Sequence, residues 1–146
     1  MKKFAVNFVI SLVVYFVINY LWLVVFAEIR PPFVLTSAPR IIPIWVQVIH
    51  WVQIPISMFL YFYLGTKLNL LGNHLLNFLS ASGGFVFGLY MMYLGSYALI
   101  LPQLSFPMIG ALIFENTNNL YIAITVVSIL PTLLIWLGMF YKSRKA

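Results

Sequence analysis

Behind two lysines, the chain begins with FAVNFVISLVVYFVINYLWLVVFA (residues 4–27). This run contains no charged side chain and is long enough to cross the hydrocarbon core of a bilayer as one helix. It is also longer than the apolar region of a signal peptide, which has about 7–15 residues. We therefore expect it to remain in the protein as an uncleaved membrane anchor.

The rest of the chain has the same character. Of its 146 residues 64% are apolar and only 7% are charged, and the mean hydropathy is +1.05. An average soluble domain is about 45–50% apolar and about 25% charged, and a small one has too little interior to bury more. The composition excludes a soluble enzyme, a disordered tail and a nucleic-acid-binding domain, and leaves a polytopic membrane protein.

Three further apolar runs have the length of a membrane span. They cover about residues 42–64, 75–101 and 120–141. We find no internal repeat and no soluble segment, so residues 1–146 are predicted to form one integral membrane domain. The expected fold is all-α, a four-helix transmembrane bundle.

The positions of the basic residues predict the orientation. With the N-terminus inside, six basic residues fall on the inner side: Lys2, Lys3, Lys67, Lys142, Arg144 and Lys145. Only Arg30 and Arg40 fall outside. Because cytoplasmic segments are enriched in Lys and Arg, both termini are predicted to be cytoplasmic. The positive charge and apolar bulk are typical of a bacterial cytoplasmic membrane protein.

The predicted loops differ in kind. Gly65–His74 is short and polar and is expected to form an inner hairpin turn, whereas the outer loop 28–43 contains four prolines and should be stiff. The second outer loop, residues 102–119, is too apolar for a solvated loop and too interrupted for another span. We expect an interfacial or re-entrant segment there, as a lid on the bundle or as a surface for a substrate or partner.

A polar stripe lies in the second span. Gln47, His50 and Gln53 fall on one helical face, with His50 roughly 12 Å into the span. Polar side chains are costly in hydrocarbon unless they are paired. His50 is interpreted either as a satisfied hydrogen-bonding residue or as part of a proton-coupled or ligand-binding path.

Two other spans carry groups suited to helix contacts. Asn7, Ser11 and Tyr15 follow one another at four-residue steps, as expected for hydrogen bonds between helices. Small residues on the third span, Gly84, Gly88 and Gly95, predict close helix packing, either within the chain or between copies.

Tyr90, Tyr93 and Tyr97 line a neighbouring face of the third span. They are interpreted as core packing or as the wall of a cavity for an aromatic, isoprenoid or lipid ligand. The outer charges are Glu28, Arg30, Arg40 and Glu115. They predict either a neutral ion-pair cluster or a site for a phosphate or carboxylate group.

The chain has no cysteine and no aspartate, and it contains no zinc-protease, nucleophile-elbow or Walker motif. We expect no cofactor and no metal site. The favoured function is a non-catalytic accessory subunit that binds a membrane-protein partner, in the manner of small immunity proteins. Two alternatives remain open: a homo-oligomeric transporter or channel that uses the stripe around His50, and an enzyme or binder that acts on a lipid-linked substrate at the outer leaflet. The expected partners are membrane lipids and either another membrane protein or further copies of the chain.

Overall fold

The computed structural model describes residues 1–29, 44–94 and 106–145. Within these ranges the secondary structure is helical and contains no strand, which confirms that the protein is all-α. The helices are α1 (Lys2–Ile29), α2 (Ile44–Lys67), α3 (His74–Ala81), α4 (Gly83–Leu94), α5 (Pro107–Thr117) and α6 (Leu120–Lys145).

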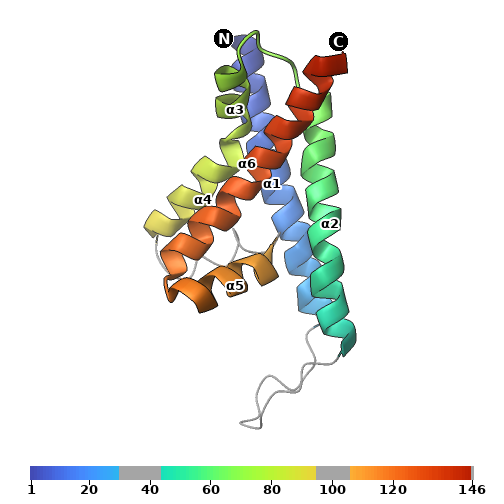
Figure 1. Ribbon diagram of the computed structural model, residues 1–146, viewed down its shortest axis with the longest axis vertical. Coiled ribbons are helices and arrows are strands. Elements are labelled where there is room, and N and C mark those ends of the chain that lie inside the picture. The colour runs from blue at the N-terminus through green and yellow to red at the C-terminus, as the bar shows by residue number, and fades with distance from the viewer. Residues whose placement is uncertain (30–43, 95–105, 146) are drawn as a thin grey trace.

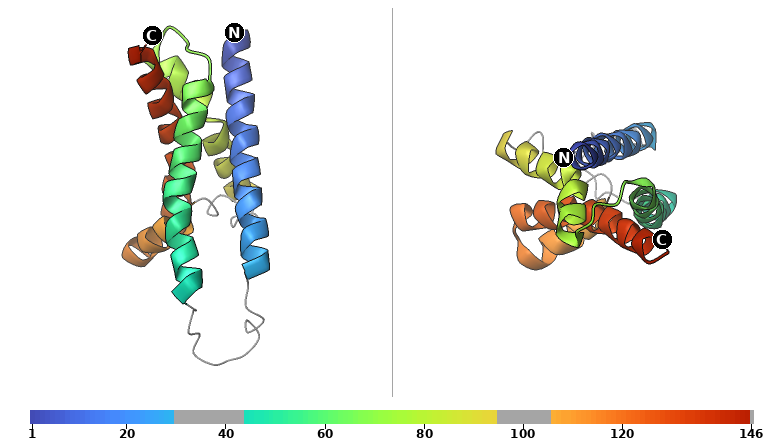
Figure 2. Two further views of the ribbon diagram at one scale, coloured as in Figure 1. Left: turned by 90° about the vertical axis from the view of Figure 1, so that its right-hand side faces the viewer. Right: turned by 90° about the horizontal axis from the view of Figure 1, so that it is seen from above.

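The long helices run side by side along one axis (Figure 1). Both termini and loop 68–73 lie at the same end of the bundle, while α5 lies across the opposite end, against α6 (Figures 1 and 2). We call the end with the termini the basic end and the opposite end the α5 end. The basic end carries six basic residues, Lys2, Lys3, Lys67, Lys142, Arg144 and Lys145.

Two stretches, Lys2–Val25 and Tyr121–Lys145, are long and apolar enough to cross a membrane by length and composition. They correspond to the first and fourth predicted spans. The complete four-span arrangement and its orientation stay predictions.

The third predicted span is not one helix. It is divided at Ser82, whose backbone N–H and hydroxyl both donate to the Leu79 carbonyl, at 3.2 and 2.7 Å. Gly83 then starts α4 directly against the backbone of α1, where an added Cβ would lie 2.8 Å from the Leu12 nitrogen. The break therefore lies where the chain passes close to the backbone of α1.

The inner loop is shorter than predicted. Helix α2 continues to Lys67 and α3 begins at His74, so Gly65 belongs to a helix and the turn covers only residues 68–73. The Asn73 side chain caps α3 by accepting a hydrogen bond from the Leu75 nitrogen at 2.8 Å. The apolar run ends at Leu64, but the helix continues over residues 65–67. These residues are not apolar, so the hydropathy pattern did not predict that they are helical.

The apolar second outer segment forms helix α5. Pro107 stands at its first turn, and its end is marked by Asn118 in the left-handed conformation, with φ 49°. Phe106, just before α5, is buried and packs on Tyr61 of α2 with ring centroids 6.2 Å apart. The start of α5 is thus anchored in the bundle.

Helices α2 and α6 cross in direct backbone contact. A Cβ added at Gly138 would lie 2.9 Å from the Gly65 Cα and would overlap the Phe62 carbonyl oxygen. A Cβ at Gly65 would in turn lie 2.8 Å from the Ile135 carbonyl carbon. This is the close approach that paired small residues permit between membrane helices.

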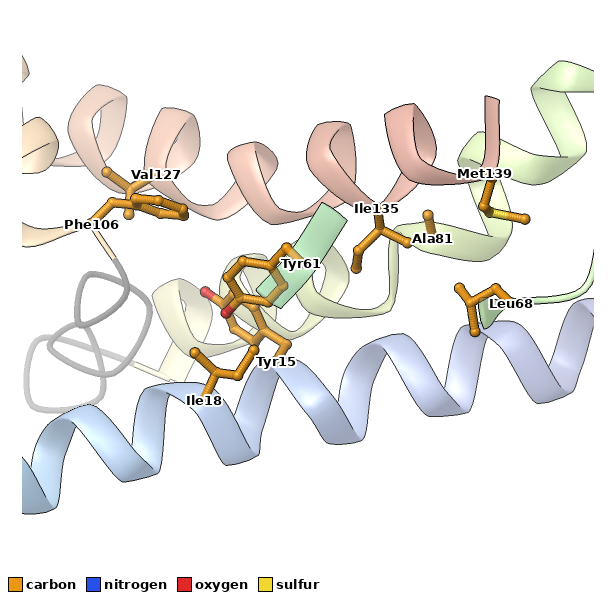
Figure 3. Packing of buried hydrophobic residues seen from close by; sticks show 9 residues of the cluster. All are labelled: Tyr15, Ile18, Tyr61, Leu68, Ala81, Phe106, Val127, Ile135 and Met139. Carbon is orange, nitrogen blue, oxygen red and sulfur yellow. The ribbon is translucent and has the colours of Figure 1, made fainter. Parts of the chain in front are cut away.

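The buried apolar core extends along the bundle between α1 and α6, and it includes Tyr61 of α2 and Ala81 of α3 (Figure 3). At its centre the rings of Tyr15 and Tyr61 lie against each other, with centroids 6.4 Å apart. The members of this core are Tyr15, Ile18, Tyr61, Leu68, Ala81, Phe106, Val127, Ile135 and Met139.

We predict that Gly138→Ala destabilises the protein although alanine is the better helix former. The added methyl meets backbone atoms that cannot rotate away, so the overlap should outweigh the propensity gain and cost about 1–3 kcal/mol. Unfolding in micelles with a rising fraction of dodecyl sulfate measures the change. Gly72→Ala is the control, since a Cβ there meets nothing within 4 Å. Equal stability of the two variants would contradict the proposed backbone contact.

Candidate functional site

The outer charge cluster is only partly described by the structure. Glu115 lies on α5 with its side chain exposed, and Glu28 lies in the last turn of α1. The side chain of Glu28 and all of Arg30 and Arg40 lie outside the described residues. The structure therefore places both acids toward the α5 end but does not test the cluster (Figure 1).

The polar stripe of α2 points into the bundle where it is described. Gln53 and Ser57 are fully buried. Ser57 accepts a hydrogen bond from the Trp22 indole at 2.9 Å, which joins α2 to α1. The side chains of Gln47 and His50 lie outside the described residues, so a path through His50 stays a prediction.

Of the three tyrosines on the third predicted span, Tyr90 has a described side chain, and it lies on the outside of the bundle. Tyr90 is 58% exposed on α4. It therefore lines no closed cavity among the described residues, because so large an exposed fraction places its ring on the outside of the bundle. The Tyr93 side chain and all of Tyr97 lie outside the described residues.

The glycine face is occupied by other helices of the same chain. A Cβ at Gly84 would come within 2.7 Å of the Tyr15 ring of α1, and one at Gly88 would overlap the Ser128 hydroxyl of α6. These two residues pack α4 between α1 and α6. Gly95 lies outside the described residues.

The polar stripe of α1, which consists of Asn7, Ser11 and Tyr15, contacts the inner loop through Asn7. Asn7 Nδ2 donates to the Asn69 carbonyl at 2.8 Å, and Asn7 Oδ1 accepts from the Asn69 backbone and side-chain nitrogens at 3.2 and 3.4 Å. Ser11 donates to the Ser80 carbonyl of α3 at 3.4 Å. Asn7 therefore bonds to the loop and not to another helix. Ser11 does reach α3, although its shorter bond, at 2.8 Å, goes to the Asn7 carbonyl of its own helix.

Sequence reasoning missed two further bonds that hold this loop. Lys142 Nζ donates to the Leu68 carbonyl at 2.7 Å, and Asn77 Oδ1 accepts from the Leu71 nitrogen at 2.8 Å. From the sequence alone, Lys142 served only to predict the orientation in the membrane. Asn77 is a single polar residue in an apolar segment and gave no sign of a partner. Only the folded loop brings its carbonyl and N–H groups to them.

The outward face of α1 is a regular apolar surface that the other described helices leave largely uncovered, although Phe16 on it packs on Phe87 of α4 with ring centroids 6.1 Å apart. We call it the outward α1 seam. Its apolar side chains recur at alternating intervals of three and four residues, the spacing of a coiled-coil seam. All are exposed, and they lie opposite the stripe of Asn7, Ser11 and Tyr15. The seam consists of Val6, Val9, Val13, Phe16, Tyr20 and Leu23.

The comparisons with known proteins give no relative. The chain matches no model of a protein family, no curated protein and no solved structure. Among the described residues, no group of three or more His, Cys, Asp or Glu side chains is placed to hold a metal ion.

We predict that Asn7→Leu destabilises the protein by about 1–3 kcal/mol, because it removes three hydrogen bonds and leaves the Asn69 groups without them. The same dodecyl sulfate titration measures the change. Val6→Leu, one residue away on the exposed side, should be neutral. If both substitutions were neutral, the bonds to Asn69 would not stabilise the fold.

Proposed function

We propose that this chain is a four-pass integral membrane protein with both termini and loop 68–73 on the cytoplasmic side. Besides the two stretches of spanning length, α2 has 24 residues, which corresponds to about 36 Å of helix. The α3–α4 pair runs from the basic end toward α5 and supplies the remaining pass, the third along the chain (Figure 1). Each pass is then comparable to the hydrocarbon thickness of about 30 Å.

The distribution of side chains supports this placement. Polar side chains such as Asn7, Ser11 and Ser57 are buried, while large apolar side chains such as Phe59 and Trp51 are exposed. This arrangement suits a hydrocarbon solvent and not water. The basic residues gathered at one end favour that end as the cytoplasmic one.

Within the membrane, we propose that the protein is a non-catalytic subunit that binds a transmembrane helix of a larger partner. The outward α1 seam carries this proposal. Six apolar side chains at heptad spacing present the knobs that a second helix accommodates between its own side chains. Among the described buried polar groups, in contrast, Trp22 bonds to Ser57 and Ser11 to Ser80, which joins helices of this chain to one another.

The test compares two valines that are equally exposed. Val13 on the seam and Val52 on α2 are each 48% exposed. Both should tolerate tryptophan against lipid, but only Val13→Trp should block a packed helix. Gentle detergent extraction from the native membrane, followed by native mass spectrometry, should find a hetero-complex that Val13→Trp reduces about tenfold or more. Val52→Trp should leave the complex intact.

Each other result has a definite meaning. A complex made only of copies of this chain would overturn the accessory role in favour of a homo-oligomer. A monomer, or a hetero-complex unaffected by Val13→Trp, would mean that the seam faces lipid and that the proposed mode of partner binding is wrong.

A further inference from the structure

A hollow of about 400 Å³ lies at the basic end, between the inner loop, the start of α3 and the end of α6. Its walls are residues 70–72 together with four polar residues, Asn73, His74, Asn77 and Ser143. These residues contribute no acidic group. The hollow is separate from the outward α1 seam, so a ligand could bind there whether or not the seam binds a partner helix.

Asn77 gives this hollow a buried donor. The residue is only 5% exposed. Its Oδ1 is engaged by the Leu71 nitrogen at 2.8 Å, whereas its Nδ2 has no partner among the described residues. Because Oδ1 is held by the loop, the amide is fixed in orientation and its two N–H groups remain for a ligand in the hollow.

The first turn of α3 adds to the donor set. Asn73 accepts from the Leu75 nitrogen, but the backbone N–H of His74 has no acceptor in the described structure. Unpaired N–H groups and the helix dipole give a helix N-terminus a partial positive charge. Such an end favours an anion when other donors converge on it.

Full positive charge lies beside the same wall. The Arg144 guanidinium lies over the Phe140 ring, 4.6 Å from its centroid. The His74 ring packs on the same Phe140 ring with centroids 5.5 Å apart. Arg144 thus shares contact with Phe140 with the lining residue His74 and follows the lining residue Ser143 in the chain, although its own side chain is exposed. Both acids of the chain, Glu28 and Glu115, belong to elements at the α5 end (Figure 1).

We propose that this hollow binds a phosphate group, supplied by the head group of an anionic phospholipid or by free phosphate. Asn77 Nδ2 and the His74 backbone N–H supply directed donors, and Arg144 supplies charge. Phosphate oxygens accept several hydrogen bonds at once, which suits convergent donors beside a guanidinium. A lipid source agrees with a basic end at the cytoplasmic surface, where anionic head groups gather.

The sharpest variants are at Gly72, which lines the hollow and where an added Cβ meets nothing within 4 Å. Gly72→Asp places a negative charge at the site without steric overlap, and Gly72→Asn is the neutral control of the same shape. The probe is phosphatidylglycerol in mixed micelles with phosphatidylcholine. Native mass spectrometry of the full chain counts the lipid retained.

We expect the wild type and Gly72→Asn to retain phosphatidylglycerol in preference to phosphatidylcholine, and Gly72→Asp to retain about fivefold less. If inorganic phosphate at equal ionic strength does not displace the lipid, the head group is the source. If inorganic phosphate displaces the lipid, and raises the melting temperature of Gly72→Asn but not of Gly72→Asp, the free anion is recognised. Equal retention by the two Gly72 variants would overturn the proposal.

A second pair separates this site from the general charge of the basic end. Arg144→Gln and Lys2→Gln each remove one positive charge, and neither residue lines the hollow itself. Arg144, however, packs on Phe140 together with the lining residue His74. Only Arg144→Gln should weaken retention of phosphatidylglycerol, by about fivefold. An equal loss in both variants would mean that a diffuse basic surface attracts the lipid and that the hollow is not a site.

Discussion

The described structure depends on how closely other helices approach α6. At Gly65 and Gly138 the backbones of α2 and α6 touch, and at Gly88 the α4 backbone rests on Ser128 of α6. No side chain larger than hydrogen fits at these three positions without a shift of the backbone or of the side chain it faces. Because α2, α3, α4 and α5 all contact α6, these contacts set the positions of most other elements. Helix α1 is the exception, since it packs mainly on α3 and α4 and leaves one face uncovered.

Besides the close contacts at the glycines, hydrogen bonds hold the helices and the inner loop together. In hydrocarbon, a buried amide or hydroxyl is costly unless it finds a partner inside the protein, and each bond between helices contributes about 0.6–2 kcal/mol. At the basic end, Asn7 of α1 and Lys142 of α6 donate hydrogen bonds to carbonyls of the inner loop. The loop is thereby fixed by helices far away in the sequence. A fixed loop can support a preformed hollow, and the orientation of Asn77 follows from its bond to Leu71.

Much of the fold followed from hydropathy, because length and apolar character are local properties. The helical regions near residues 4–27, 42–64 and 120–141 agree with α1, α2 and α6. The division at Ser82 did not follow, since it reflects the passage of Gly83 against the α1 backbone. Gly65 was wrongly assigned to a loop for a similar reason. It is helical and packs against Gly138, and a contact between residues so distant in the sequence leaves no local pattern. For the candidate site, spacing identified Asn7 and Ser11 as contact residues, but it could not show that Tyr90 points outward or that Asn77 lines a hollow.

The central claim is that the basic end and the α5 end lie on opposite sides of a membrane. Because the chain has no cysteine, single substitutions can report this directly. Gly72 and Asn116 are both exposed, and they lie at the basic end and on α5, respectively. With a membrane-impermeant maleimide, Asn116→Cys should be labelled in intact cells and Gly72→Cys only after the membrane is opened. Labelling of both positions in intact cells, or of neither, would contradict the four-pass arrangement and with it this account of the protein.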